Sequence, residues 1–154
     1  MRLLVVRFSA LGDVTLLVPV LSELQRSHPD LSLTVISRPH LAALFRPLGL
    51  DFVPAHLQNQ HRGPAGMLRL AWELRKSYPG EKLQLIDQHN VLRSHLLSAA
   101  ARLQGIPVVR LQKDRPARRK LTRSPPKQLH WVPHVTERYA ATFTRAGYPL
   151  AGRP

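Results

Sequence analysis

The chain has 154 residues, 44% of them hydrophobic, which is enough for one buried core and predicts one domain of ordinary size. It contains no cysteine, which excludes a disulfide framework, thiolate zinc sites and thiol catalysis, and fits a reducing compartment. Lysine and arginine number 23 against 9 acidic residues, and this net charge of +14 predicts attraction to polyanions such as nucleic acid, anionic lipid or phosphorylated glycans.

Neither apolar stretch near the N-terminus has the length of a membrane segment. Residues 2–6 are interrupted by Arg7 too soon to form the core of a signal peptide. The longest apolar stretch, residues 14–21, is well short of the roughly 20 residues that span a bilayer. We therefore expect a soluble, cytoplasmic protein.

Apolar patterning along the chain predicts strands that alternate with helices. The predicted strands are 2–8, 31–37, 51–55, 82–87 and 106–112. The predicted helices are 13–27, with Pro19 as a possible kink, 39–49, 65–78, 90–105, with Asn90 as its cap, and 134–147. Trp72 and Leu74 are expected to lie in the core, and residues 113–128 form a basic, proline-containing loop.

This alternation is typical of βαβ units, so we expect an α/β fold with a Rossmann-like parallel sheet flanked by helices. Right-handed crossovers place every strand-to-helix turn at one edge of such a sheet. Ligands bind at that edge, beyond the carboxyl ends of the strands. The segments expected there are 9–13, 37–40, 87–90 and part of 112–128.

The first of these turns lies in the stretch RFSALGDV, residues 7–14. It is neither a dinucleotide fingerprint nor a phosphate-binding P-loop, because Gly12 is its only glycine and no Gly-Lys-Ser/Thr follows. Asp13 has two possible roles. It could cap or begin a helix, or it could be a general base facing a cleft.

Two spaced groups of residues carry a resemblance to a known family. The first is Ser9, Leu11, Gly12, Asp13, Val14 and Pro19. The second is Asp87, Leu92, Arg93 and Ser94, in the stretch LIDQHNVLRSHLL. With this spacing the chain resembles the heptosyltransferase-type glycosyltransferases of family nine, which act in lipopolysaccharide core biosynthesis, and the resemblance extends over essentially the whole chain.

The resemblance implies the N-terminal, acceptor-binding domain of a two-domain GT-B enzyme. Residues 1–147 would form that domain and residues 148–154 the start of the interdomain linker, with the C-terminal donor domain absent. The implied reaction is an inverting transfer of heptose from ADP-heptose to a sugar hydroxyl, without a metal or other cofactor. The chain alone is expected to be inactive or nearly so, since positioning of two substrates needs both walls of the cleft.

In this resemblance Asp13 is the catalytic base. Ser9 and the backbone N–H groups of residues 12–14 would hold an anionic group at a helix N-terminus. The complete set of expected acceptor-binding residues is Ser9, Gly12, Arg38, Arg62, Asp87, Arg93, Ser94, Arg118, Arg119 and Lys120. For some of these a structural role is equally open: Arg93 and Ser94 could belong to a solvated helix face, and Asp87 could cap the following helix.

The expected partners are an anionic, lipid-linked core oligosaccharide as acceptor, a nucleotide-sugar bound by the absent domain, and the anionic inner face of the inner membrane, contacted by the basic loop. The scattered histidines show no metal-site spacing. Two other functions stay open. One is a non-catalytic module that binds anionic glycans or lipids. The other, nucleic-acid binding, has only charge in its favour, since no interleaved aromatics form a stacking surface.

Overall fold

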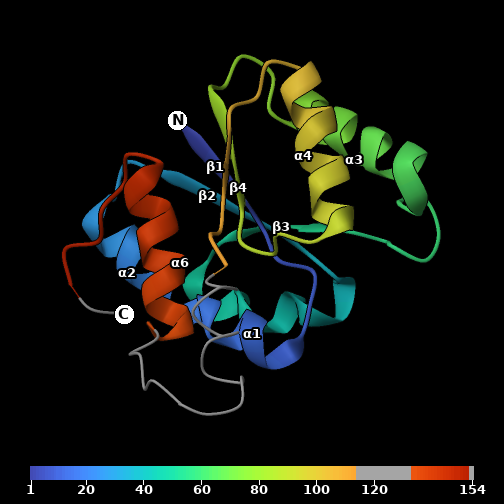
Figure 1. Ribbon diagram of the computed structural model, residues 1–154. Coiled ribbons are helices and arrows are strands. Elements are labelled where there is room, and N and C mark those ends of the chain that lie inside the picture. The colour runs from blue at the N-terminus through green and yellow to red at the C-terminus, as the bar shows by residue number, and fades with distance from the viewer. Residues whose placement is uncertain (114–132, 153–154) are drawn as a thin grey trace, which may run out of the picture.

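A five-stranded sheet, parallel throughout, forms the centre of the molecule, in the order β3-β2-β1-β4-β5 (Figure 1). The computed structural model describes residues 1–113 and 133–152. The strands are β1 (Arg2–Val6), β2 (Ser32–Ser37), β3 (Asp51–Pro54), β4 (Leu83–Asp87) and β5 (Val108–Arg110). The predicted α/β fold with a Rossmann-like parallel sheet is confirmed.

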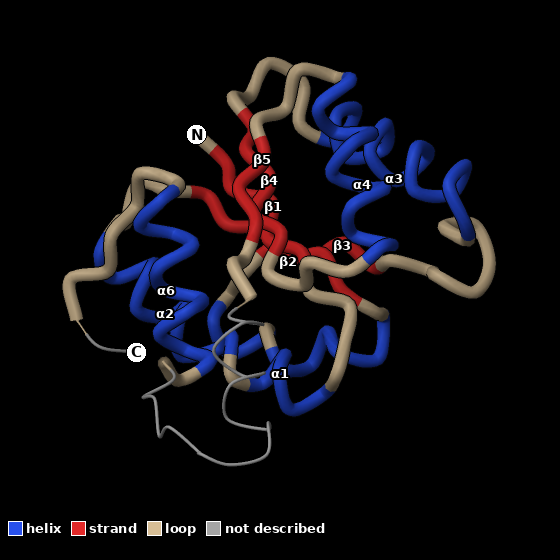
Figure 2. The backbone as a smooth tube through the Cα atoms, in the orientation of Figure 1, coloured by secondary structure: helices blue, strands red, loops and turns tan. Residues whose placement is uncertain are grey.

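Helices cover both faces of this sheet. The α-helices are α1 (Leu11–Thr15), α2 (Leu17–Ser27), α3 (Gly63–Ser77), α4 (Leu92–Leu103) and α6 (Val135–Arg145), and the short 3₁₀ helices are η1 (Pro39–Leu44) and η2 (Arg46–Leu48). Figure 2 shows α3 and α4 together on one face and α2 and α6 on the other. Among the described residues, no helix is long and apolar enough to cross a bilayer.

The sheet separates the core into two layers, and the strands alternate between them. Leu4 and Val6 of β1 pack in the layer beneath α3 and α4. Leu3 and Val5 pack in the layer beneath α2 and α6. The central strand is therefore apolar on both sides, which explains its continuous hydrophobic sequence.

Prolines account for two differences from the predicted helices. The expected helix over 13–27 begins earlier, at Leu11, and is divided at Leu16 into α1 and α2. Pro19 has no N–H to donate to the carbonyl four residues before it, which explains the break. The expected helix over 39–49 is instead the pair η1 and η2, because Pro47 interrupts it in the same way.

Two predictions about single residues on the helices are wrong. Trp72 was expected in the core but is 57% exposed, because its position on α3 lies opposite the buried stripe that contains Leu74. Asn90 was expected to cap α4, but the helix begins one residue later with Val91 at the cap position. Asn90 instead has a left-handed backbone conformation, with φ 49°.

The order of the strands determines where a ligand can bind. The chain leaves β1 toward β2 and β3 on one side, and β4 and β5 lie on the other side of β1. The connections therefore diverge at the carboxyl ends of β1 and β4, which is where open α/β sheets form their ligand crevice. Residues 7–13 and 88–91 lie at this divergence.

Gly66 on α3 packs directly against the backbone of His61. A Cβ added at Gly66 would lie 2.3 Å from the backbone carbonyl carbon of His61, whereas a Cβ at Gly12 would meet no atom within 4 Å. We expect Gly66→Ala to lower the free energy of unfolding by about 2 kcal/mol or more. Gly12→Ala should change it little. Urea denaturation of both variants checks this, and equal midpoints would contradict the packing described.

Candidate active site

Asp13 lies in the first turn of α1, directly after the turn that ends β1. The cap position of this helix is occupied by Ala10, without a side-chain cap bond, so Asp13 is not the helix cap. Its carboxylate forms an ion pair with the guanidinium of Arg7 through Oδ2, and 44% of its side chain is exposed. The acid is thus fixed in direction and open to solvent.

Arg7 is the buried cation that holds this acid. It is only 7% exposed, and its Nη1 also donates to the backbone oxygen of Gln88 at 2.6 Å. Its guanidinium lies 5.7 Å from the ring centre of Tyr139, whose hydroxyl donates to the backbone oxygen of Asp13 at 3.3 Å. One arginine therefore joins the ends of β1 and β4 to α1 and α6.

A pocket of about 430 Å³ opens beside this ion pair, and we call it the Asp13 pocket. Its lining residues are Arg7, Ser9, Ala10, Asp13, His89, Val91, Leu111, Lys113, Val135 and Arg138. They come from the carboxyl ends of β1, β4 and β5 and from the start of α6. The pocket is at the divergence of the chain connections, as the sheet topology predicts.

His89 lines the Asp13 pocket together with Asp13. Burial and the nearby positive charge of Arg7 lower the pKa of His89 to about 4, so the ring is neutral at neutral pH. Its Nε2 lies 3.4 Å from the hydroxyl oxygen of Ser9, and its ring packs edge-on against Phe8. A neutral imidazole can accept or donate a hydrogen bond to a ligand hydroxyl.

Asp87 and Ser94 support the His89 loop from inside the protein. Asp87 is fully buried, and its Oδ1 accepts from the backbone N–H groups of His89 at 3.0 Å and Asn90 at 2.8 Å. Ser94 is 1% exposed, and its hydroxyl lies 2.9 Å from Asp87 Oδ2 and accepts from the N–H of Val91. Both residues were expected to bind acceptor. The geometry instead gives them a supporting role: Asp87 accepts from the loop N–H groups of His89 and Asn90, and the cap position of α4 is Val91.

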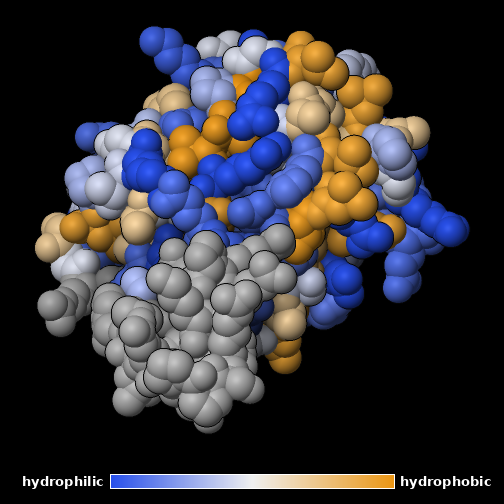
Figure 3. Space-filling model, in the orientation of Figure 1, coloured by the Kyte–Doolittle hydropathy of each residue, from blue (hydrophilic) through white to orange (hydrophobic). Residues whose placement is uncertain are grey.

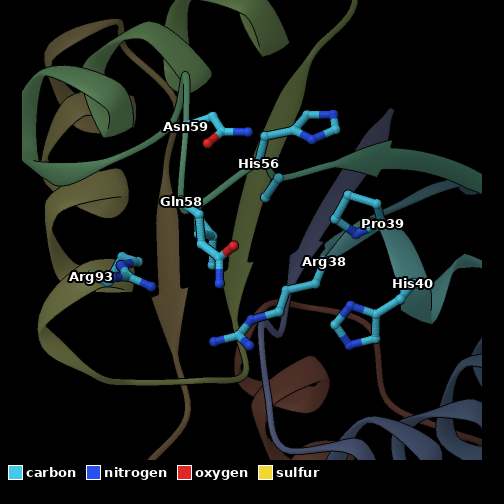
Figure 4. A pocket seen from close by; sticks show the side chains of 9 residues that line it. Arg38, Pro39, His40, His56, Gln58, Asn59 and Arg93 are labelled. Atoms are coloured by element: carbon cyan, nitrogen blue, oxygen red, sulfur yellow. The ribbon is translucent and has the colours of Figure 1, made fainter.

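A second pocket, of about 490 Å³, lies beyond the carboxyl ends of β2 and β3, and we call it the Arg38–Arg93 pocket. It is lined by Arg38, Pro39, His40, Ala55, His56, Leu57, Gln58, Asn59 and Arg93. Figure 4 shows the side chains of Arg38 and Arg93 pointing toward the same space from opposite sides, with Gln58 between them. Two convergent guanidinium groups are suited to a phosphate or carboxylate.

A third pocket, the middle pocket, joins the other two. It also measures about 490 Å³ and is more apolar, with a lining of Phe8, Ser9, Arg38, Gly63, Pro64, His89, Val91, Leu92, Arg93 and Leu96. It shares Ser9 and His89 with the Asp13 pocket, and Arg38 and Arg93 with the Arg38–Arg93 pocket. The three pockets therefore form one groove along the carboxyl edge of the sheet.

This groove is electropositive and contains unused hydrogen-bonding capacity. Arg7, Arg38, Arg93, Lys113 and Arg138 line it, with Asp13 as the one acid among the lining residues. The buried side-chain atoms that have no hydrogen-bond partner within the described part of the chain include Arg7 Nε, Arg38 Nε, His89 Nδ1 and Arg138 Nε. Such atoms are rare in proteins, and their concentration beside an open groove fits a polar, anionic ligand.

The other five expected site residues lie outside the groove or outside the described residues. Gly12 is exposed and lines none of these three pockets, and the N–H of Val14 is already bonded to Ala10 within the helix. Arg62 is exposed at the start of α3, also outside the three pockets. Three further expected residues, Arg118, Arg119 and Lys120, lie outside the described residues.

Three residues of the Asp13 pocket were not among the expected site residues: Arg7, His89 and Arg138. Arg7 was visible as a charge that ends an apolar strand, and His89 as an imidazole two residues past the end of another. Arg138 gave no signal, because only the fold brings α6 to this edge. Within residues 1–113 and 133–152, no three acidic or histidine side chains gather as a metal site.

Comparison with solved structures identifies the class of fold. The chain matches a family 9 glycosyl transferase from Veillonella parvula with a TM-score of 0.68 and 19% identity, over 99% of this chain and 44% of that one. It matches E. coli heptosyltransferase WaaC with ADP with a TM-score of 0.61 and 19% identity, over 100% of this chain and 49% of that one. The fold is therefore that of a Rossmann-like domain of a GT-B glycosyltransferase.

A second structure of WaaC, with ADP-2-deoxy-2-fluoro heptose, gives a TM-score of 0.63 and 18% identity, over 100% of this chain and 50% of that one. The chain thus spans about half the length of these structures. No protein-family model matches the chain, and no curated protein does.

The support of the His89 loop by Asp87 can be tested by mutation. Asp87→Ala removes a buried acceptor of three hydrogen bonds and should lower the free energy of unfolding by about 2 kcal/mol or more. Asp30→Ala, at an exposed turn, is the matched control and should change it by less than about 0.5 kcal/mol. Thermal or urea unfolding measures both, and an equally mild effect at Asp87 would contradict its role.

The environment of His89 predicts a pH dependence. Its folded-state pKa, about 4, lies below the ordinary 6.5, so the unfolded chain binds this proton more readily. Its contribution to stability is complete above pH 6.5 and is lost as pH falls toward 4. We expect the stability of the wild type to fall more steeply over this range than that of His89→Gln. NMR titration of the His89 ring should give a midpoint near 4, and a midpoint near 6.5 would refute the assignment.

Proposed function

We propose that this chain is the acceptor-binding domain of an inverting glycosyltransferase that resembles the heptosyltransferases. The observation that carries the proposal is the position of Asp13. This carboxylate is held by a buried arginine, is half exposed, and faces a groove at the divergence point of a GT-B-type sheet. A fixed, accessible carboxylate at a ligand crevice has the geometry of a general base.

In the proposed reaction the acceptor hydroxyl lies within hydrogen-bond reach of Asp13. Its oxygen attacks the anomeric carbon of the donor sugar, its proton passes to the carboxylate, and the bond to the nucleoside diphosphate breaks. Proton removal of this kind contributes typically 10²–10⁴-fold to the rate. Ion pairing of Oδ2 with Arg7 fixes the carboxylate, and the hydroxyl of Ser9 and the neutral ring of His89 offer hydrogen bonds that orient the sugar.

The acceptor we propose is a saccharide that carries phosphate or carboxylate groups and is linked to a lipid. The Arg38–Arg93 pocket supports the charged part of this proposal, because it places two guanidinium groups at one end of the groove that leads to Asp13. The middle pocket between them has the apolar wall that the flat face of a sugar ring or a lipid linker would contact.

The donor belongs to the part of the enzyme that this domain does not supply. The family resemblance favours ADP-heptose, and the E. coli neighbours were solved with ADP and with a fluorinated ADP-heptose. A complete active site would then need a nucleotide-sugar domain facing the groove, at the cytoplasmic face of the inner membrane. Alone, the chain should transfer sugar slowly or not at all, because the second substrate is not positioned.

A non-catalytic anionic-glycan module is the second candidate. The observation in its favour is the groove itself, whose lining has five cationic side chains for one acid and could hold a polyanionic glycan without any chemistry. The two candidates make the same prediction for binding and differ in the consequence of altering Asp13.

Binding and catalysis can be separated by substitution. Arg38→Gln with Arg93→Gln should weaken binding of a phosphorylated core saccharide by about tenfold or more, since each removes a charge-assisted contact. Asp13→Asn should leave this affinity unchanged, and Arg46→Gln, an exposed arginine outside the three pockets, is the control. Calorimetric titration measures the affinities, and an unchanged value for the double variant would contradict the acceptor site.

The catalytic role has its own readout. When the chain is combined with a nucleotide-sugar domain that restores transfer, Asp13→Asn should reduce the rate about 10²–10⁴-fold at unchanged acceptor affinity. The binding-module alternative predicts no transfer in any combination. Robust transfer from ADP-heptose by the 154-residue chain alone would contradict the assignment to an acceptor domain.

A further inference from the structure

Two helices on one face of the sheet expose large apolar side chains to solvent. On α3, Leu68 is 51% and Trp72 57% exposed, and on α4, Leu92 is 77% and Leu103 84% exposed. Elsewhere in the described residues, the exposed large hydrophobics are Met1 and Leu11 alone. In the view of Figure 3, hydrophobic residues gather over the region that α3 and α4 occupy in Figure 1.

The spacing of these residues places them in a stripe along one side of each helix. Leu68 and Trp72 are four apart on α3, and on α4 the stripe runs from Leu92 through half-buried Leu96 to Leu103. Each helix already buries its opposite side against the sheet, through residues such as Leu70 and Leu97. An ordinary surface helix would be polar on its outer side, so the α3–α4 face has an unmet apolar surface.

The same two helices carry many basic residues. On α3 and α4 the cations are Arg69, Arg75, Lys76, Arg93 and Arg102, with Arg62 at the start of α3. The one acid on these two helices is Glu73. Its pKa is lowered by the hydrogen bond from Arg69, with a further contribution from His61. The ammonium group of Lys76 lies 5.0 Å from the ring centre of Trp72. Apolar and aromatic side chains on helices that also carry several cations are typical of surfaces that bind the headgroup region of anionic membranes.

We propose that the outer face of α3 and α4 docks onto an anionic lipid bilayer. Leu68, Trp72, Leu92 and Leu103 enter the interface between headgroups and acyl chains. The arginine and lysine side chains contact the lipid phosphates. A protein partner would have to be strongly acidic to match the same cations, whereas an anionic bilayer supplies both the charge and the apolar layer.

The position of this face gives it a role in acceptor capture, and this part of the inference rests on the proposed function. The N-terminal ends of α3 and α4 form one wall of the middle pocket through Pro64, Leu92 and Leu96. Docking of the α3–α4 face therefore brings the mouth of the groove to the bilayer surface. A lipid-linked saccharide can then enter the groove while its lipid stays in the membrane.

The two tryptophans allow a direct test with the full chain. The chain contains Trp72 and Trp131, the latter outside the described residues. In Trp131→Phe, Trp72 is the single reporter, and its emission should shift to the blue and be quenched by brominated lipid when vesicles of phosphatidylglycerol and phosphatidylethanolamine are added. Vesicles of pure phosphatidylcholine should give a much weaker response. The converse variant, Trp72→Phe, reports on Trp131 in the same way.

Substitutions measure how much the apolar stripes contribute to vesicle binding. Leu68→Ser with Leu103→Ser keeps Trp72 and should weaken sedimentation with the anionic vesicles by about tenfold or more, because two leucine side chains no longer leave water on binding. Leu11→Ser is the matched control, since Leu11 is 61% exposed but lies on α1. Circular dichroism confirms that each variant is folded.

Three results would overturn the proposal: no vesicle binding, binding without a response from Trp72, or binding that the double leucine variant does not weaken. The second would place the membrane contact elsewhere, for example on the basic residues of 113–127. A concentration-dependent dimer that the leucine substitutions abolish would assign the face to a second copy of the chain. Asp13→Asn removes no side chain of the α3–α4 face and should bind vesicles as the wild type does, so failure of the proposed function is distinguishable from failure of membrane docking.

Discussion

The ion pair between buried Arg7 and solvent-accessible Asp13 organises the functional edge of this fold. Arg7 ends the central strand, where water is scarce, and an arginine in that position needs partners for its charge and its donors. It finds them in the Asp13 carboxylate and the Gln88 backbone oxygen. The same contacts that satisfy the cation therefore fix the acid, the loop after β4 and the start of the groove. An electrostatic requirement of the core thus positions the candidate catalytic group.

Most of the fold could be predicted from the sequence. A strand buried on both faces leaves a continuous apolar run, and β1 was found for that reason, while β2 was found from its β-branched, alternating sequence. The errors fall where backbone chemistry overrides apolar spacing: Pro19 and Pro47 divide segments whose hydrophobic pattern is helical throughout. Trp72 was misplaced for a different reason. The apolar pattern does not say which side of α3 faces the sheet at Trp72, and in the described residues this side chain is mostly exposed, with only Lys76 over its ring.

The site was predictable only in part. Ser9, Asp13 and Arg38 belong to strand-end turns that meet at one edge of a parallel sheet, whereas Arg93 was named from the family resemblance; all four line the groove. Asp87 and Ser94 share that edge but face inward, and sequence position alone does not separate the two orientations. Arg138 was missed because its place in the Asp13 pocket depends on how α6 packs, which is a long-range property of the fold.

The catalytic role of Asp13 requires that an acceptor hydroxyl binds within hydrogen-bond distance of its carboxylate. The most direct measurement is a crystal structure of the chain soaked with a phosphorylated core saccharide. The account predicts an acceptor hydroxyl about 3 Å from Asp13 Oδ1, with an anionic group between Arg38 and Arg93. A saccharide bound in the Arg38–Arg93 pocket alone, with the Asp13 carboxylate unapproached, would contradict the catalytic role and leave a binding module.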